Sequence, residues 1–264
     1  MIGDDWRRFW ELSMTLARTE FKLRYYDSFL GYLWSLIRPL LFFGVIYLVF
    51  TEIFKVGRGI PHYGVYLLAG IVYWTYFSET TNGCVQCLLA REALLRKIQF
   101  PRMAIPVSVS LTAIFNLVVN FIPVLAFALA SGITPTLSWL ELLPIALGYI
   151  VLATGVGMLL AALYVRYRDI RPIWEVLSQV LFYFSPIMYD ASRYKGLEGY
   201  AMMNPIAMLQ TQMGHAFISP ELRSAAVAAG GAIRLVIPIS LIVLAFVIGA
   251  WVFTRDAPKV AEIL

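Results

Sequence analysis

The residues from Met103 to Leu140 form an unbroken stretch without a single Asp, Glu, Lys or Arg. About 20 apolar residues are enough for a helix to cross the hydrocarbon core of a bilayer, so this stretch is too long for one crossing. Gly132, Pro135 and Ser138 mark a turn within it, after a helix that is expected to end near Ala130. The stretch therefore predicts one membrane-spanning helix and the beginning of the connection to the next.

The composition agrees with a chain whose main solvent is lipid. Hydrophobic residues make up 60% and charged residues 14% of the 264 residues, whereas soluble domains are roughly 25% charged. A soluble protein of this size exposes much of its surface to water and could not hide so many apolar side chains. An ordinary cytosolic enzyme, a disordered chain and a secreted disulfide scaffold are therefore excluded.

Six apolar segments are predicted to be membrane-spanning helices. They cover residues 34–54, 62–81, 103–130, 142–165, 172–189 and 235–254. The expected fold is an all-α integral membrane protein with six transmembrane helices in a single transmembrane domain, residues 1–264. Spans 1 to 5 lie within residues 34–189, and a cytoplasmic tail, residues 255–264, follows the sixth span.

Residues 1–30 are expected to form an amphipathic helix at the membrane interface. One face carries Trp6, Phe9, Trp10, Met14, Ala17 and Phe21, and the opposite face carries Arg8, Glu11, Thr15, Arg18 and Lys22. Tryptophan on one side and basic residues on the other suit the boundary between headgroups and acyl chains. The alternative is a cytosolic helix that packs on a partner.

The segment 190–234 is expected to be an outward loop that contains a pair of short re-entrant helices. Its part from Gly199 to Pro220 carries Asn204, Gln210 and Gln212, which makes it too polar for a span that faces lipid. Irregular polar backbone survives at membrane depth only where protein or water covers it. A seventh span is the alternative.

The positions of the basic residues predict the orientation, because cytoplasmic loops are enriched in Lys and Arg. If both termini are cytoplasmic, the inner segments hold 15 of the 21 Lys and Arg residues. Both termini inside, which requires an even number of spans, is therefore the expected topology.

The chain carries no recognisable site for ATP or metal. None of its five lysines is followed by Ser or Thr, as a P-loop requires. Cys84 and Cys87 form a C-x-x-C pair, but a zinc site needs four ligands, and His62 and His215 are isolated. We therefore expect no catalytic residues, no metal and no cofactor in this chain, so active transport would need a partner or an ion gradient.

The positions of the acidic residues give little support to transport driven by an ion gradient. A carrier coupled to ions usually places acidic groups at mid-membrane. Here Glu52, Glu79, Glu141 and Glu175 all lie near the predicted ends of spans, where solvation at the interface is the simpler interpretation.

Two inner loops and one aromatic run are candidates for function. Residues 90–101 (AREALLRKIQFP) and 164–172 (YVRYRDIRP) are either docking surfaces or basic membrane anchors. The aromatic run Phe182, Tyr183 and Phe184 lies deep in a predicted span. These rings either pack in the protein or line a wet pore, where they could stack weakly on sugar rings.

Five motifs, in order along the chain, resemble a known family. They are RYYDSFLGYLWSLIRP at 24–39, LLRKIQFPR at 94–102, RYRDI at 166–170, FYFSPIMY at 182–189 and Asn204-Pro205. Together they resemble the ABC-2 type permeases that export polysaccharides such as O-antigen, teichoic acid, capsule or galactan across the bacterial inner membrane. Each motif is short, but the ordered set covers nearly the whole chain.

The resemblance implies a permease homodimer bound to two copies of a separate ABC ATPase that holds ATP and Mg²⁺. The loop at 90–102 and the RYRDI turn would contact that ATPase. The residues this assigns to coupling are Arg91, Glu92, Arg96, Lys97, Arg168 and Asp169. The resemblance also implies membrane lipid and a lipid-linked polysaccharide as partners, and no nucleic acid.

The substrate in this family is a glycan or polyol-phosphate chain on a lipid pyrophosphate. Lys22, Arg24 and Arg38 are expected at headgroup depth, where they could attract the pyrophosphate, because guanidinium and ammonium groups pair well with it. General anchoring of the membrane protein is the alternative role. Aromatic residues complete the predicted substrate-binding set: Trp34, Tyr47, Phe182, Tyr183 and Phe184.

The sequence leaves two rival functions open. The first is an ABC-2 exporter of a drug or small lipid. The second is a polytopic membrane enzyme of glycan assembly, which would need a carboxylate cluster or a metal site on a loop. The outer loops offer only Asp190, Glu198 and Glu221, which are not clustered.

Overall fold

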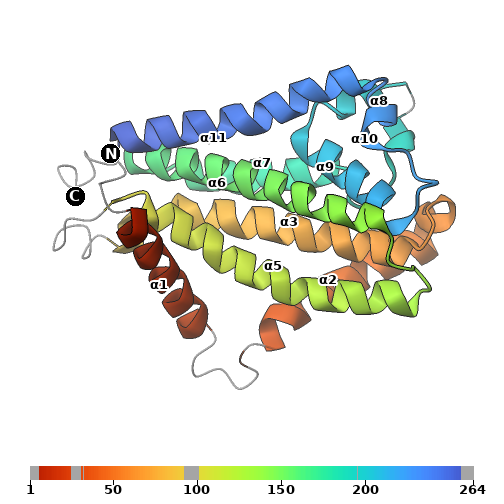
Figure 1. Ribbon diagram of the computed structural model, residues 1–264, viewed down its shortest axis with the longest axis horizontal. Coiled ribbons are helices and arrows are strands. Elements are labelled where there is room, and N and C mark those ends of the chain that lie inside the picture. The colour runs from red at the N-terminus through yellow and green to blue at the C-terminus, as the bar shows by residue number, and fades with distance from the viewer. Residues whose placement is uncertain (1–5, 25–30, 32, 92–100, 195, 257–264) are drawn as a thin grey trace.

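The computed structural model describes residues 6–24, 31, 33–91, 101–194 and 196–256. Over these residues the chain is helical and has no strand (Figure 1). The long helices are α1 (Trp6–Arg24), α2 (Leu33–Leu48), α3 (Tyr63–Val85), α5 (Ala104–Ala130), α6 (Leu142–Arg166), α7 (Ile170–Phe184) and α11 (Val236–Asp256). Shorter helices are α8 (Glu198–Ala201), α9 (Pro205–Met213) and α10 (Ala225–Ala228).

Four helical segments are long and apolar enough to cross a membrane. They are Leu33–Ile53, Ala104–Ala130, Leu137–Arg166 and Ala232–Asp256. The first extends α2 by a π-helical turn, Val49–Ile53, and the third begins with a 3-10 turn, Leu137–Glu141. These segments confirm an all-helical membrane protein, and each lies on a span predicted from the sequence.

The two remaining predicted spans, 62–81 and 172–189, are also helical, but they differ from the other four. Helix α3 has 23 residues, of which 18 are buried, because α2, α5, α6 and α7 pack against it. Helix α7 has only 15 residues and ends at Phe184 rather than near Tyr189. The residue before a proline is disfavoured in the α region, and Ser185, which precedes Pro186, is extended.

The centre of the bundle is joined by hydrogen bonds as well as by apolar packing. The Tyr76 hydroxyl of α3 lies 2.9 Å from Ser110 Oγ of α5, which in turn lies 2.8 Å from Thr154 Oγ1 of α6. The rings of Tyr73 and Tyr149 stack with their centroids 4.9 Å apart. Buried polar groups that satisfy one another in this way fix how three helices meet.

Helices α6 and α11 run alongside each other in Figure 1 and approach most closely at two glycines. A Cβ atom on Gly249 would lie 2.0 Å from the backbone oxygen of Gly155. A Cβ atom on Gly155 would lie 2.5 Å from the Cα of Phe246. Small residues at a crossing let backbones pack tightly in a membrane, where no hydrophobic force drives helices together.

Helix α1 packs across α5 through a narrow strip of its surface. Phe9, Ser13 and Ala17, spaced four residues apart, are its buried residues, and Phe21 meets the ring of Phe115 at 5.7 Å. Trp6, at the start of α1, is 57% exposed. The basic positions of the predicted polar face, Arg8, Arg18 and Lys22, are exposed.

Helices α8, α9 and α10 lie at the end of the bundle opposite the beginning of α1 and the end of α11 (Figure 1). Two of the polar residues of this region, Gln212 and Asn204, form hydrogen bonds within the protein. The Gln212 side chain donates to Glu141 (2.6 Å) and accepts from the backbone N–H of Ala225 (3.0 Å). Asn204 caps α9 by accepting from the N–H of Ile206 (3.0 Å). Polar side chains predicted to be unsuited to lipid therefore lie against protein.

Candidate functional site

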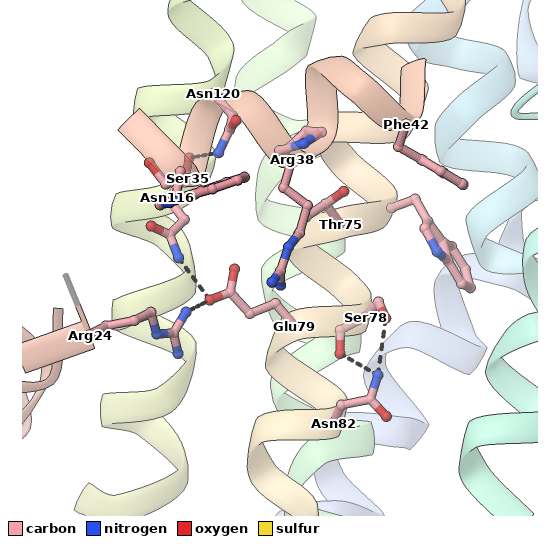
Figure 2. A pocket seen from close by; sticks show the side chains of 13 residues that line it. Arg24, Ser35, Arg38, Phe42, Thr75, Ser78, Glu79, Asn82, Asn116 and Asn120 are labelled. Atoms are coloured by element: carbon pink, nitrogen blue, oxygen red, sulfur yellow. Dashed lines mark hydrogen bonds and ion pairs between the residues drawn. The ribbon is translucent and has the colours of Figure 1, made fainter. Parts of the chain in front are cut away.

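A cavity of about 840 Å³ lies between α2, α3 and α5, beside the end of α1 (Figure 2). Its lining is mixed, with charged, amide, hydroxyl and aromatic side chains. The lining residues are Arg24, Trp34, Ser35, Arg38, Pro39, Phe42, Trp74, Thr75, Ser78, Glu79, Asn82, Asn116 and Asn120. Apolar helices thus surround an open cavity with a mixed lining, and the cavity is large enough for a headgroup or a sugar unit.

Glu79 of α3 is the acidic residue of the cavity lining and joins three helices. Its Oε1 accepts from Arg24 at the end of α1, and from the Asn116 side chain of α5 at 2.7 Å. The Glu79 side chain is 19% exposed, compared with 37% for Arg24. A carboxylate with two donors, one of them charged, is held firmly in this position.

Arg38 of α2 is the second basic residue of the cavity. Its side chain reaches down from α2 into the chamber, toward Glu79 (Figure 2). Within the part of the chain that the structure describes, Arg38 forms no hydrogen bond or ion pair, and the residue is exposed. Its guanidinium group is therefore available to a ligand.

Three aromatic side chains form another part of the wall. Trp34 and Phe42 come from α2, and Trp74 comes from α3. Phe182 of α7 lies behind them, with ring centroids 5.9 Å from Phe42 and 5.3 Å from Trp74. Rings of this kind can stack on the apolar face of a sugar or cover the first part of a lipid chain.

A chain of ion pairs runs from the cavity to the loop that follows α3. Arg24 lies 3.9 Å from Glu20 on the same helix, and Glu20 also pairs with Arg91. Arg91 donates in addition to Ser108 Oγ of α5 at 2.8 Å. The C-terminal turn of α1 is therefore held by ion pairs on two sides, to Glu79 in the cavity and to Arg91 after α3.

The structure brings together some of the residues predicted to bind substrate and separates others. Arg24, Trp34 and Arg38 line the same cavity, and Phe182 supports its aromatic wall. Lys22, Tyr47, Tyr183 and Phe184 lie elsewhere. Lys22 is exposed on α1, Tyr47 lines a separate cavity of about 480 Å³ near Tyr63, and Tyr183 and Phe184 are exposed on α7. Their roles stay predictions.

The residues predicted to couple to an ATPase are only partly described. Glu92, Arg96 and Lys97 lie outside the described residues. Arg91 is half-buried and bonded internally, as described above. Arg168 and Asp169 are exposed in the turn between α6 and α7, and the Arg168 guanidinium lies 5.2 Å from the centroid of the Tyr164 ring.

Sequence reasoning missed the polar half of the cavity. Glu79 was interpreted as a solvated residue near the end of a span, and Asn82, Asn116 and Asn120 were not singled out. A signal existed for two of them. Asn116 and Asn120, four residues apart on one helical face, are carboxamides inside a segment without charge.

The chemistry of the cavity is that of binding. Guanidinium and amide donors suit an oxyanion, and hydroxyl groups suit sugars. Among the described residues, no group of three His, Cys, Asp or Glu side chains could hold a metal ion. Cys84 and Cys87 are buried free thiols.

A bundle of lipid-exposed helices around such a chamber is the architecture of an integral membrane transport protein. Comparison with protein families makes the class definite. The ABC-2 type transporter family matches residues 11–217, and the chain belongs to this family. The match includes most of α1 and all the residues that line the cavity, and it extends past the end of α9.

The chain is also similar to proteins that are named as export permeases. It is 31% identical over 180 residues to an O-antigen export system permease protein RfbA of Klebsiella pneumoniae. The aligned region covers 68% of this chain and 69% of that protein. It is 29% identical over 217 residues to the O-antigen export system permease protein RfbA of Myxococcus xanthus, which covers 81% of this chain and 83% of that protein.

Proposed function

We propose that the chain is the membrane permease of an ATP-driven exporter that moves a lipid-linked cell-surface polysaccharide across a bacterial inner membrane. The observation that carries this proposal is the cavity, in which two arginines and a wall of aromatic rings lie together between apolar helices. Its donors match a phosphate headgroup, and its rings match sugar or lipid. The named activity of the similar O-antigen permeases supports the same substrate class.

Arg24 and Arg38 receive the pyrophosphate of the lipid carrier in this proposal. Trp34, Phe42 and Trp74 contact the first sugar or the beginning of the prenyl chain. Lys22, exposed on α1 two residues before Arg24, adds positive charge near the entrance. Binding energy comes from charge-assisted hydrogen bonds between the guanidinium groups and the phosphate oxygens.

The proposed topology has six crossings, with both termini cytoplasmic. Helix α3 crosses inside the bundle, where its polar residues face protein rather than lipid, and α7 crosses with the help of the turns that follow it. At about 1.5 Å per residue, α7 alone is about 22 Å long, which is shorter than the hydrocarbon core. The helices α8 to α10 form the re-entrant cap on the outer side.

Two copies of the chain assemble with two copies of an ABC ATPase, which binds ATP and Mg²⁺ and supplies the energy. The permease itself hydrolyses no ATP. Arg168 and Asp169, exposed at the α6–α7 turn, and the segment with Glu92, Arg96 and Lys97 contact the ATPase. Arg91 acts at the base of that segment through its pair with Glu20.

Affinity purification from native membranes in mild detergent, followed by mass spectrometry, tests this assembly. A P-loop ATPase should be recovered in about equal amount. Deleting the permease should remove the polysaccharide from the cell surface and leave lipid-linked glycan at the inner face of the membrane. Recovery without any ATPase after crosslinking, or a deletion strain with normal surface polysaccharide, would contradict the proposal.

The topology makes a separate prediction. A membrane-impermeant maleimide should label Thr136→Cys in intact spheroplasts, because residue 136 is exposed in the outer loop between α5 and α6. It should label Tyr167→Cys, exposed in the inner turn between α6 and α7, only after permeabilisation. Cys84 and Cys87 are buried, so the unsubstituted chain is the background control. The reverse labelling pattern would show that the orientation is inverted.

A further inference from the structure

The cavity combines two basic side chains and one acidic side chain. Arg24 and Arg38 each carry one positive charge, and Glu79 carries one negative charge, so the lining has a net charge of +1. The acidic group is not placed at random, since it is fixed between Arg24 and Asn116. A carboxylate is unexpected in a chamber that receives an anion, because it repels the ligand.

We propose that Glu79 is a selectivity residue, whose carboxylate neutralises Arg24 and so lowers the affinity of the cavity for singly charged phospholipid headgroups. The inference rests on the proposed function, because it assumes that the ligand is a lipid carrying more than one negative charge. A bilayer holds a large excess of phosphodiester lipids next to any lateral opening. Discrimination against them matters as much as affinity for the substrate.

The two arginines of the cavity differ in their ion-pair partners. Arg38 is free of partners among the described residues, whereas Arg24 is shared by Glu79 and, at 3.9 Å, Glu20. A ligand with one negative charge can pair with Arg38 but meets an arginine that is already neutralised. A ligand with a second negative charge gains a further interaction by competing with Glu79 for Arg24.

Geometry keeps this competition in place. Glu79 receives hydrogen bonds from two different helices, so its carboxylate does not swing freely away from Arg24. The Glu79 side chain is 19% exposed, and its charge is therefore screened less than that of a surface group. Specificity comes from the repulsion between the Glu79 carboxylate and the ligand. A doubly charged ligand overcomes this repulsion through its attraction to Arg24 and Arg38, and a singly charged ligand does not.

Binding of two lipids to the purified full-length chain tests this inference. The probes are short-chain phosphatidylglycerol, with one negative charge, and farnesyl pyrophosphate. In detergent or in zwitterionic nanodiscs, the unsubstituted chain should bind farnesyl pyrophosphate more tightly. Glu79→Gln should bind phosphatidylglycerol roughly two- to fivefold more tightly, which is the size of effect expected when one charge of a partly exposed ion pair is removed. The ratio of the two affinities should fall.

Matched variants control for folding and charge. Glu79→Asp keeps the charge and should keep most of the discrimination. Glu175→Gln removes an exposed carboxylate of α7 that, among the described residues, pairs only with Arg171, four residues away, and it should change neither affinity. Asn82→Asp adds a carboxylate at an exposed position on the same wall and should weaken phosphatidylglycerol binding.

An unchanged affinity ratio in folded Glu79→Gln would overturn the inference, and so would tighter phosphatidylglycerol binding by Asn82→Asp. Inorganic pyrophosphate should compete more weakly than farnesyl pyrophosphate. Equal competition would overturn the assignment to a lipid headgroup. Neither probe carries a glycan, so these results do not depend on a polysaccharide being the cargo. A failure of the proposed export function would instead appear in the deletion strain.

Discussion

Arg38→Gln should reduce polysaccharide export roughly 10- to 100-fold, the cost of losing one charge-assisted contact to a phosphate group. Arg38 projects into the cavity and has no partner among the described residues, so its replacement leaves no buried charge behind (Figure 2). The amount of inserted protein should therefore stay the same. Surface polysaccharide measured against the level of the permease in membranes gives the result.

Two variants make the Arg38 test specific. Arg38→Lys keeps the charge but loses the planar guanidinium group that pairs with two phosphate oxygens. Export by Arg38→Lys should therefore lie between that of the unsubstituted chain and that of Arg38→Gln. Arg255→Gln removes an exposed arginine that lies 5.5 Å from the centroid of the Trp251 ring, away from the cavity, and export should be normal. If Arg38→Gln exports normally, the arginine is only a membrane anchor.

Gly249→Leu should prevent the folded bundle from forming. Its side chain would meet the backbone oxygen of Gly155, which cannot move aside as a flexible side chain could. Overpacking against a fixed backbone costs about 3 kcal/mol or more, a large part of the stability of a typical domain. The expected result is loss of the monodisperse protein peak in detergent chromatography and a low yield in membranes.

Gly44→Ala is the matched control for this effect. Gly44 also lies in an apolar helix, but a Cβ atom there would have no neighbour within 4 Å. Alanine is a better helix former than glycine, so Gly44→Ala should leave the yield unchanged or raise it. A normal, monodisperse Gly249→Leu protein would mean that α6 and α11 do not cross at these glycines.

The sequence was most informative where a helix faces lipid. The predicted span 103–130 corresponds to Ala104–Ala130, and 235–254 corresponds to Val236–Asp256, because an uninterrupted apolar composition marks such helices directly. The predicted span 172–189 extended too far because Ser185 and Pro186 end α7 after Phe184. Proline chemistry could have given that boundary, but the apolar composition of the following residues masked it.

The cavity was harder to predict because packing assembles it. Glu79 and Arg24 are 55 residues apart in the chain, and Glu79 and Asn116 are 37 residues apart. The sequence pattern identified Arg24, Trp34 and Arg38 from a motif within one segment. It could not identify Glu79, which resembles an interfacial glutamate until α1 and α5 are placed beside it.

The close contact of Gly155 with Gly249 has a consequence for movement within the bundle. Two backbones in direct contact cannot slide without breaking the contact, so α6 and α11 behave as one stationary frame, to which α3 is joined through buried tyrosines. Helix α2 buries only Pro39 and Ile46. Helix α7 buries only Trp174, Ser178 and Phe182. Their positions are therefore set largely by whatever lies on their outer surfaces. The surroundings of the molecule can therefore displace the wall of the cavity that α2 supplies without disrupting the contact between α6 and α11.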